Sequence, residues 1–350
     1  MRRKNMKKSL VLGLMGVLVL TGCSAGNTSS GNAATPTTTV AESPSQEESA
    51  TSEPLTLEVL DSEGNAHTQT FTEVPKRVIT NNQSSLELLL ELGLQESIIG
   101  TITLDDPLPE HLEAAFSNIE VITDSKTDPA KEVIAGMNPD LVIGRAATFT
   151  DERYGTVTTL NGMGINVYTQ LASQMKGEQS LDNIIQDVRN VGEIFNVEEK
   201  ANTFADELQA RLDAVTEKIE GANSEPLKVM LMTAYTDGTY NVFGANATFQ
   251  NEILEAIGAV NINEKGGAQS LENLLDLNPD VIIYIYNNKN AETDQLAVDA
   301  IYNNELIQEV TAVANQKVIQ VPYTEIMGYG HRVVDCIEKL AADLYPELFN

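Results

Sequence analysis

The sequence predicts an α/β fold in which two parallel-sheet, Rossmann-like lobes are joined by one long helix. Three observations lead to this class. A helix-turn-strand segment occurs twice, short apolar runs alternate with amphipathic helical patterns, and residues 181–220 contain no proline. Short runs that are apolar throughout are typical of strands buried on both faces of a parallel sheet. A strand-helix-strand order favours such a sheet with crossover helices.

The repeated segment occupies residues 128–144 (DPAKEVIAGMNPDLVIG) and residues 268–284 (AQSLENLLDLNPDVIIY). In each copy Asn-Pro-Asp ends a short amphipathic helix, because proline lacks a donor and disfavours the helical conformation of the residue before it. An apolar strand follows, and the duplication predicts two similar lobes. The positions that are identical in the two copies are Glu132 and Glu272, Asn138 and Asn278, Pro139 and Pro279, Asp140 and Asp280, and Ile143 and Ile283.

The N-terminal lobe is predicted to span residues 55–180. A β-hairpin lies at its edge, and Ser84 or Ser85 is expected to cap the first helix. The remaining predicted elements are strands near residues 78–80, 98–101 and 165–168 and helices near residues 86–92, 110–116 and 156–163.

Residues 181–220 are predicted to form a helical linker that contains the hinge helix. A first helix runs from about residue 181 to residue 195. Asn196 and Glu199, a variant of the capping box, begin the second. Its apolar positions share one face, and some 22 residues give a rod of roughly 33 Å.

The C-terminal lobe is predicted to span residues 221–350. Its expected elements are strands near residues 229–232 and 318–321, a long polar loop at 233–243, helices at 249–257 and 332–344, the second repeat copy, and a loop at 322–331.

The amino terminus has the pattern of a secretory signal. Basic residues precede an apolar run from Leu10 to Leu20, which is shorter than the ~20 residues that a spanning helix needs. The ending Leu20-Thr21-Gly22-Cys23 resembles the lipobox of bacterial lipoproteins. That resemblance makes residues 1–22 a lipoprotein signal peptide and Cys23 the lipid anchor. Residues 23–54, which are poor in large apolar side chains, are predicted to be a disordered tether.

The chain is strongly acidic, with a formal net charge of −29. This charge argues against binding to nucleic acid or to anionic lipid surfaces. Cys336, the only other cysteine, lies in an apolar helical pattern and is predicted to be a small core residue.

The lipobox, the tether, two lobes joined by one helix, and E-x6-P-D in each lobe together resemble the substrate-binding lipoproteins of ABC importers. The likeness is to the subgroup with a single hinge helix (class III periplasmic-binding-protein-like), which serves ferric siderophores, haem and cobalamin. It covers Val74 to the chain end. Residues 78–93 (VITNNQSSLELLLELG) and 327–332 (MGYGHR) also fit the siderophore binders.

The resemblance implies a protein, not an enzyme, that is anchored at the extracytoplasmic face of the bacterial cell membrane. It implies capture of an iron-siderophore complex and delivery to an ABC permease dimer with its ATPase. The same role for haem or cobalamin is the alternative. Iron enters only as part of the bound chelate, no resident cofactor or protein-bound metal is expected, and we expect a monomer.

In this family one exposed glutamate on each lobe meets arginines of the permease. Glu132 and Glu272 hold that position here, so the resemblance implies that they dock the permease. Two equivalent carboxylates match a pseudo-symmetric partner, and arginine-carboxylate pairs contribute mainly orientation and steering. The other interpretation is that both are solvated helix-face residues.

Ligands of open parallel sheets collect beyond the carboxyl ends of the strands, so two facing lobes predict a cleft lined by those loops. Arginines there favour an anionic ligand, and tyrosines supply flat apolar faces with a polar tip. Surface ion pairs and ordinary loop anchors are the other interpretations. The predicted ligand-binding residues are Asn82, Gln83, Arg145, Arg153, Tyr235, Tyr240, Tyr286, His331 and Arg332.

Two other classes of function remain open at this stage. A tethered chelatase is one, because the two-lobed fold also resembles metal-cluster and tetrapyrrole chelatases, although no phosphate loop, nucleophile elbow or zinc-helix motif occurs. A receptor that passes ligand occupancy to a signalling partner is the other.

Overall fold

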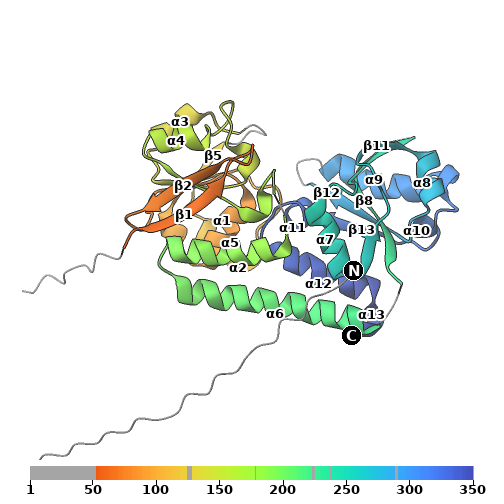
Figure 1. Ribbon diagram of the computed structural model, residues 1–350. Coiled ribbons are helices and arrows are strands. Elements are labelled where there is room, and N and C mark those ends of the chain that lie inside the picture. The colour runs from red at the N-terminus through yellow and green to blue at the C-terminus, as the bar shows by residue number, and fades with distance from the viewer. Residues whose placement is uncertain are drawn as a thin grey trace, which may run out of the picture. The chain divides into compact units, whose positions relative to one another are not determined.

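Two β-sheets, each covered by helices, organise the described part of the chain (Figure 1). The predicted signal peptide, most of the predicted tether and Cys23 lie outside the described residues. The computed structural model describes residues 53–123, 128–177, 179–222, 225–236, 238–287 and 291–349.

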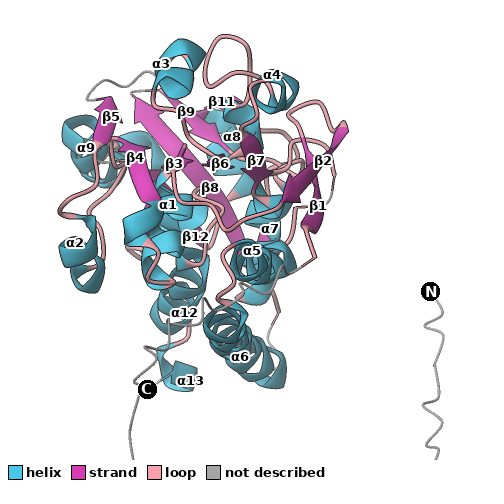
Figure 2. Cartoon of the chain, turned by 90° about the vertical axis from the view of Figure 1, so that its left-hand side faces the viewer, coloured by secondary structure: helices cyan, strands magenta, loops and turns pink. Residues whose placement is uncertain are grey.

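The first sheet has five parallel strands in the order β5-β4-β3-β6-β7 (Figure 2). Its central strands β3 and β6 are buried along their whole length, as their apolar sequences predict. A β1-β2 hairpin packs beside β7, where Gln69 Oε1 accepts a hydrogen bond from Val167 N at 2.9 Å. The strands are β1 Leu55–Leu60, β2 Ala66–Phe71, β3 Val78–Thr80, β4 Ile98–Ile102, β5 Val121–Thr123, β6 Leu141–Gly144 and β7 Asn166–Thr169.

Short helices connect these strands. The first, α1, is capped by Asn82 and not by Ser84 or Ser85, because Asn82 Oδ1 accepts a hydrogen bond from Ser85 N at 3.3 Å. It ends, as predicted, at Gly93, which has a φ of 74°. The helices are α1 Gln83–Glu91, α2 Glu110–Phe116, α3 Lys131–Gly136 and α4 Val157–Gly162, with 3₁₀ turns at Gln95–Ser97, Ala146–Thr148 and Leu171–Ser173.

Two longer helices, α5 (Leu181–Ile194) and α6 (Glu198–Ala222), follow the first sheet. The 25 residues of α6 give a rod of roughly 37 Å. Asn196 does not cap α6 as the sequence predicted. It has a φ of 53° and ends α5, and the next amide, of Val197, donates to Gly192 O at 2.9 Å. Gly192 also permits close packing, since a Cβ there would lie 2.3 Å from the Cβ of Ala201 in α6.

The second sheet has the strand order β11-β9-β8-β12-β13, with β10 also paired to β8. It is mixed and not wholly parallel, because β9 runs antiparallel to β8 and β11 runs antiparallel to β9. The predicted loop at residues 233–243 is therefore wrong. The strands are β8 Leu227–Thr236, β9 Thr239–Val242, β10 Ala259–Asn261, β11 Gly267–Ser270, β12 Val281–Tyr286 and β13 Val318–Pro322.

Three helices of this second part, α7 Thr248–Ala256, α8 Leu271–Leu277 and α12 Arg332–Leu344, lie where the sequence predicts them. The sequence did not predict α9 Ala291–Asn303, α10 Thr311–Ala314, α11 Tyr323–Ile326, α13 Pro346–Phe349 or the 3₁₀ turn at Glu305–Ile307.

The duplicated segment forms the same structure twice, as α3-β6 and as α8-β12. Asn138 and Asn278 both adopt left-handed conformations, with φ of 50° and 44°, which asparagine tolerates better than most residues. Asp140 Oδ1 accepts from the amide just before β3 at 3.0 Å, and Asp280 Oδ2 accepts from the second amide of β8 at 2.9 Å. Each aspartate thus joins its strand to the neighbouring strand of the sheet.

The larger apolar core includes residues of both sheets and of α5, α6 and α12, and a smaller one lies against the second sheet. Cys336 is buried in the larger core, as predicted, and burial raises the pKa of its thiol. Residues 52–350 form one compact unit, so the predicted lobe boundaries at 180 and 220 stay predictions. Within the described ranges, no helix is both long and apolar enough to cross a membrane.

Candidate functional site

The segment from Tyr323 to Arg332, here called the crossing segment, follows the last strand of the second sheet but contacts loops of the first. Its hydrogen-bond partners come after β3, β4, β6 and β7. The carboxyl ends of parallel strands meet at one edge of a sheet, which is where ligands of such folds collect. The crossing segment therefore lies at the edge where the sequence predicted a site.

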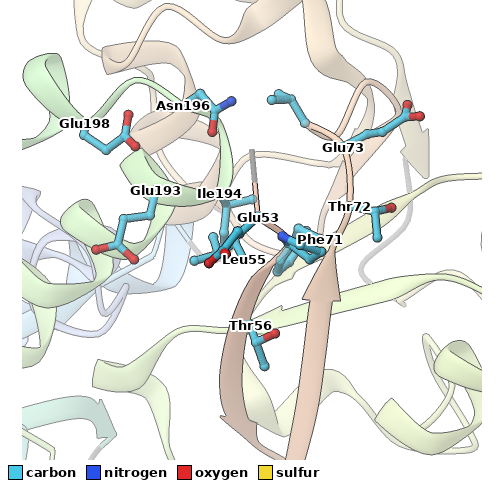
Figure 3. A pocket seen from close by; sticks show the side chains of 12 residues that line it. Glu53, Leu55, Thr56, Phe71, Thr72, Glu73, Glu193, Ile194, Asn196 and Glu198 are labelled. Carbon is cyan, nitrogen blue, oxygen red and sulfur yellow. The ribbon is translucent and has the colours of Figure 1, made fainter. Parts of the chain in front are cut away.

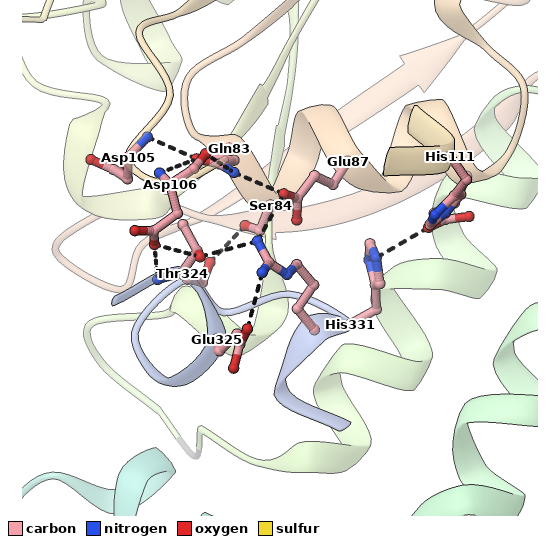
Figure 4. A network of polar contacts seen from close by, with 12 residues as sticks. Gln83, Ser84, Glu87, Asp105, Asp106, His111, Thr324, Glu325 and His331 are labelled. Carbon is pink, nitrogen blue, oxygen red and sulfur yellow. Dashed lines mark hydrogen bonds and ion pairs between the residues drawn. The ribbon is translucent and has the colours of Figure 1, made fainter. Parts of the chain in front are cut away.

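Asp106 anchors the crossing segment (Figure 4). The buried carboxylate accepts two hydrogen bonds through Oδ2, from Thr324 N at 3.0 Å and from Thr324 Oγ1 at 2.6 Å. Gln83 holds the backbone of Asp106 from the other side, because its amide donates to Asp106 O at 2.9 Å and accepts from Asp106 N at 3.0 Å. Hydrogen bonds to an ionised acceptor are among the stronger ones in proteins.

Gly330 lets the crossing segment approach α1 closely, and Gly328 lets the segment fold back on its own backbone at Thr324. Ser84 Oγ donates to Gly328 O at 2.6 Å. A Cβ on Gly330 would lie 2.4 Å from the Cβ of Ser84, a distance that real side chains do not tolerate. Gln170 also donates to Tyr329 O, at 3.2 Å. The glycines of the MGYGHR sequence thus make room for Ser84 of α1 and for the backbone of Thr324.

Arg332 joins two carboxylates of this contact, those of Glu87 and Glu325, which Figure 4 labels. Its Nη1 lies 3.3 Å from Glu87 Oε1, and its Nη2 lies 3.0 Å from Glu325 Oε1. Only 1% of Glu87 is exposed, and this burial raises the pKa of its carboxyl to about 7, although Arg332 acts in the opposite direction. The positive charge of Arg332, which the sequence predicted would bind a ligand, is therefore balanced by carboxylates of the protein itself.

We expect the Glu87→Gln variant to show a stability that differs from the wild type in a pH-dependent way. A carboxyl whose folded pKa is raised from 4.5 to about 7 loses its stabilising contribution as pH rises through that interval. The free energy of unfolding of the wild type relative to Glu87→Gln should fall by up to ~3 kcal/mol between pH 4.5 and pH 8. Urea melts of both proteins across this range measure it, and a constant difference would contradict the raised pKa.

His331 lies in the core of this contact and not at a ligand surface. Its ring packs edge-on against Phe204 of α6, with 5.3 Å between ring centroids. Burial lowers its pKa to about 4, so the ring is neutral at pH 7. His331 Nε2 lies 3.8 Å from Glu91 Oε1, which His111 Nε2 approaches to 2.8 Å. Even so, no group of three or more His, Cys, Asp or Glu side chains in the described ranges is arranged to hold a metal ion.

Arg145 completes the contact from the end of β6. Its Nη1 donates to the hydroxyl of Tyr323 at 2.9 Å, and its guanidinium lies 5.0 Å from the centroid of the Tyr329 ring. Tyr329 has a φ of 56°, a left-handed conformation that is costly for a residue with a bulky side chain. The centroid of its ring also lies 5.1 Å from the centroid of the Phe249 ring. Contacts on two sides of one strained residue mark it as a site residue that the sequence analysis did not select.

A cavity of about 580 Å³ borders Tyr329. Its walls come from the loop after β7 on one side, and from the end of β9, the start of α7 and the Gly266-Gly267 pair on the other. Ligand pockets of this size, lined by elements from both halves of a fold, are typical of binding proteins. The lining residues are Gln174, Met175, Gln179, Val242, Phe243, Gly244, Asn246, Ala247, Gln250, Gly266, Gly267 and Tyr329.

A second cavity, of about 460 Å³, lies beside the β1-β2 hairpin and the turn between α5 and α6 (Figure 3). Leu55, Phe71 and Ile194 supply apolar surface, and glutamates including Glu73 and Glu198 surround it. Its lining includes no residue of the second sheet and none of the predicted ligand residues. It therefore fits a cleft between two lobes less well than the cavity beside Tyr329.

The structure brings together most of the predicted ligand residues, but around the crossing segment and not around the cavity. Tyr286, at the end of β12, lies within electrostatic range of this network. Burial, together with the carboxylates of Asp106 and Glu325, raises the pKa of its hydroxyl. The predicted residues that take part in the contact are Asn82, Gln83, Arg145, His331 and Arg332.

Tyr235 and Tyr240 were predicted as loop residues that face a ligand, and that placement is wrong. They are cross-strand partners in the β8-β9 pair and are only 6% and 2% exposed. The Tyr235 hydroxyl accepts a hydrogen bond from Asn304 at 2.7 Å. Side chains on a strand point alternately to the two faces of the sheet, and those of two directly paired residues point to the same face. Both rings therefore pack in the smaller apolar core.

Arg153 also departs from its predicted place. About half of its side chain is exposed, and its Nη1 lies 3.2 Å from Asp128 Oδ2. This is the surface ion pair that the sequence analysis kept as the other interpretation.

Glu132 and Glu272 lie in equivalent positions, in the first turns of α3 and α8, and both are exposed. Ser270 Oγ lies 3.3 Å from Glu272 Oε2. Neither carboxylate forms an ion pair with a described residue. Two exposed, equivalent carboxylates fit the predicted docking role, which stays a prediction.

Three relatives align with most of this chain, each with 24% sequence identity. An ABC transporter substrate-binding lipoprotein of Bacillus subtilis, YvrC, matches over 80% of this chain and 83% of its own length. A cobalamin-binding protein of Halobacterium salinarum matches over 78% of this chain and 70% of its own length. The ferric-anguibactin-binding protein FatB of Vibrio anguillarum matches over 70% of this chain and 74% of its own length.

A solved periplasmic binding protein from Veillonella parvula has the same fold, with a TM-score of 0.75 at 24% identity over 85% of this chain and 93% of that one. A family model described as periplasmic binding protein matches residues 78–324. That match runs from β3 through both repeat copies and the long helix α6 into the crossing segment. The chain therefore belongs to the periplasmic binding protein family, and one of its relatives is named as a substrate-binding lipoprotein of an ABC transporter.

Proposed function

We propose that this protein captures a metal chelate outside the cell and delivers it to the permease of an ABC importer. A ferric siderophore is the first candidate, and haem or cobalamin is the alternative. The observation that carries the proposal is the cavity of about 580 Å³ whose walls come from both halves of the fold. Relatives that are named for binding cobalamin and ferric anguibactin support this range of ligands.

Docking on the permease rests, in this proposal, on Glu132 and Glu272. Their exposure and their equivalent places in two copies of one structural unit support a partner with two similar halves. A carboxylate in the first turn of a helix is ready to pair with an arginine in bidentate fashion. Such rim charges act mainly on association rate and orientation.

Cys23 would tether the protein to the membrane, which keeps it close to the permease. The resemblance of its surroundings to a lipobox supports this role, and one relative is named as a lipoprotein. The protein would act as a monomer, and iron would enter it only inside the chelate.

A thermal-shift panel tests the proposal. Purified protein would be melted with a ferric catecholate, a ferric hydroxamate, ferric citrate, haem and cobalamin in turn. A ligand at about 100 times its dissociation constant adds roughly 2.7 kcal/mol to the stability of the folded state. We expect a rise with at least one chelate and no chemical change in it. Turnover of the chelate would favour the chelatase, and no rise with any of them would contradict chelate capture.

A further inference from the structure

The cavity beside Tyr329 is polar without being charged. Its described lining has four carboxamide side chains, namely those of Gln174, Gln179, Asn246 and Gln250. The rest of that lining is apolar side chains, glycines and the Tyr329 ring, with no Lys, Arg, His, Asp or Glu among them. Carboxamides offer both donors and acceptors, and they carry no net charge.

The arginines that the sequence assigned to an anionic ligand are engaged elsewhere. Arg332 lies between Glu87 and Glu325. Arg145 donates to Tyr323 and reaches the cavity wall only through its stacking on Tyr329. Arg153 pairs with Asp128 and does not line the cavity. None of these three side chains is among the lining residues.

The free energy of moving a ligand from water into this cavity depends on the charge of the ligand. A multivalent anion that moves from water into this cavity loses its favourable hydration. No cation of the described lining compensates for that loss. The net charge of −29 on the chain adds long-range repulsion. An uncharged ligand with carbonyl and N–H groups loses far less, because the carboxamides of Gln174, Gln179 and Asn246 can replace its hydrogen bonds to water. Gln250 Nε2 already donates to Ile326 O at 3.3 Å.

We propose that this cavity takes an uncharged metal chelate and discriminates against polyanionic ones. A ferric trihydroxamate fits this class, because three hydroxamate anions balance one ferric ion. A corrinoid rich in carboxamide groups fits it as well. A ferric tris-catecholate, which is a trianion, and haem, with two carboxylates, fall outside it. The inference rests on the proposed capture of a chelate and narrows the charge of that chelate.

The test compares ligands of different charge on the full chain, purified in detergent. Isothermal titrations would use a neutral ferric trihydroxamate, a corrinoid and a ferric tris-catecholate. We expect one of the two neutral ligands to bind at least roughly 100-fold more tightly than the trianion. Its affinity should change little between about 0.05 and 0.5 M salt, because an uncharged ligand is not screened.

Two lysine variants make the cavity assignment falsifiable. Gln174→Lys and Asn246→Lys each place a cation on one wall of the cavity, and each should raise the affinity for the tris-catecholate at least roughly tenfold. Gln186→Lys, on the exposed face of α5, makes the same change of charge away from the lining and should alter no affinity.

The outcomes separate the two proposals. A trianion that binds the wild type as tightly as the neutral ligands, with an affinity that falls as salt is added, would overturn the inference and leave chelate capture standing. Lysine variants that behave like Gln186→Lys would overturn it as well. Failure of every chelate to bind would overturn chelate capture and the inference together.

Discussion

The double variant Glu132→Arg/Glu272→Arg is expected to abolish uptake of the transported chelate while its affinity for the purified protein stays the same. Both carboxylates are exposed, and neither lines the cavity beside Tyr329. Under the proposed docking, arginine in their place would face the arginines that are proposed to pair with Glu132 and Glu272, and a like-charge contact opposes docking by several kcal/mol. Each single variant should retain part of the uptake, because the other lobe still docks.

The controls for this prediction are charge reversals of the same kind elsewhere on the surface. Glu217→Arg in α6 and Glu255→Arg in α7 change exposed helix residues outside the duplicated unit and should leave uptake intact. Uptake of radiolabelled chelate by cells and titration of the purified variants measure the two properties separately. Normal uptake in the Glu132→Arg/Glu272→Arg variant would rule out docking through these residues.

The second large effect is expected for Asp106→Ala. The carboxylate accepts from Thr324 N and Thr324 Oγ1, both of which the substitution leaves without this acceptor. Loss of a buried, charge-assisted pair of hydrogen bonds should lower the free energy of unfolding by about 3 kcal/mol. Chelate affinity should fall too, since Tyr329, five residues after Thr324, would no longer be held against the cavity.

Asp151→Ala is the matched control for Asp106→Ala. Asp151 is exposed and lies 3.3 Å from Lys131 in a surface ion pair, so its removal should change stability by no more than about 0.5 kcal/mol. Denaturant melts of both variants measure the difference. Equal stability of Asp106→Ala and Asp151→Ala would show that the crossing segment does not depend on Asp106.

The fold was largely predictable because its signals are local. Apolar runs predicted β6 and β12, and the Asn-Pro-Asp sequences predicted the ends of α3 and α8. The β8-β9 hairpin was missed because Thr233 to Phe243 is polar and contains Gly238, which favours a loop. The strand pairing that overrides this preference is a tertiary effect, since Tyr235 and Tyr240 gain burial only when both lie in the sheet.

The site was less predictable, because it depends on which loops meet. Arg145 and Gln83 both follow a strand, and this correctly predicted that they lie at one edge of the first sheet. It could not show that residues 323–332 return to that edge, where Tyr323 accepts from Arg145 and Thr324 donates to Asp106. A signal for this was present in Gly330, since a glycine often marks a close approach of another segment, here Ser84 of α1. The carboxamides of the cavity carry no distinctive spacing, and only the fold gathers them.

Uptake by cells that lack this protein tests the central claim most directly. Cells with the gene deleted, and the same cells supplied with the wild-type gene, would be given each radiolabelled chelate at a limiting concentration. Delivery to an ABC permease predicts that the deletion abolishes uptake of one chelate class and that the wild-type gene restores it. Uptake of every chelate at the wild-type rate in the deleted cells would contradict the transport function.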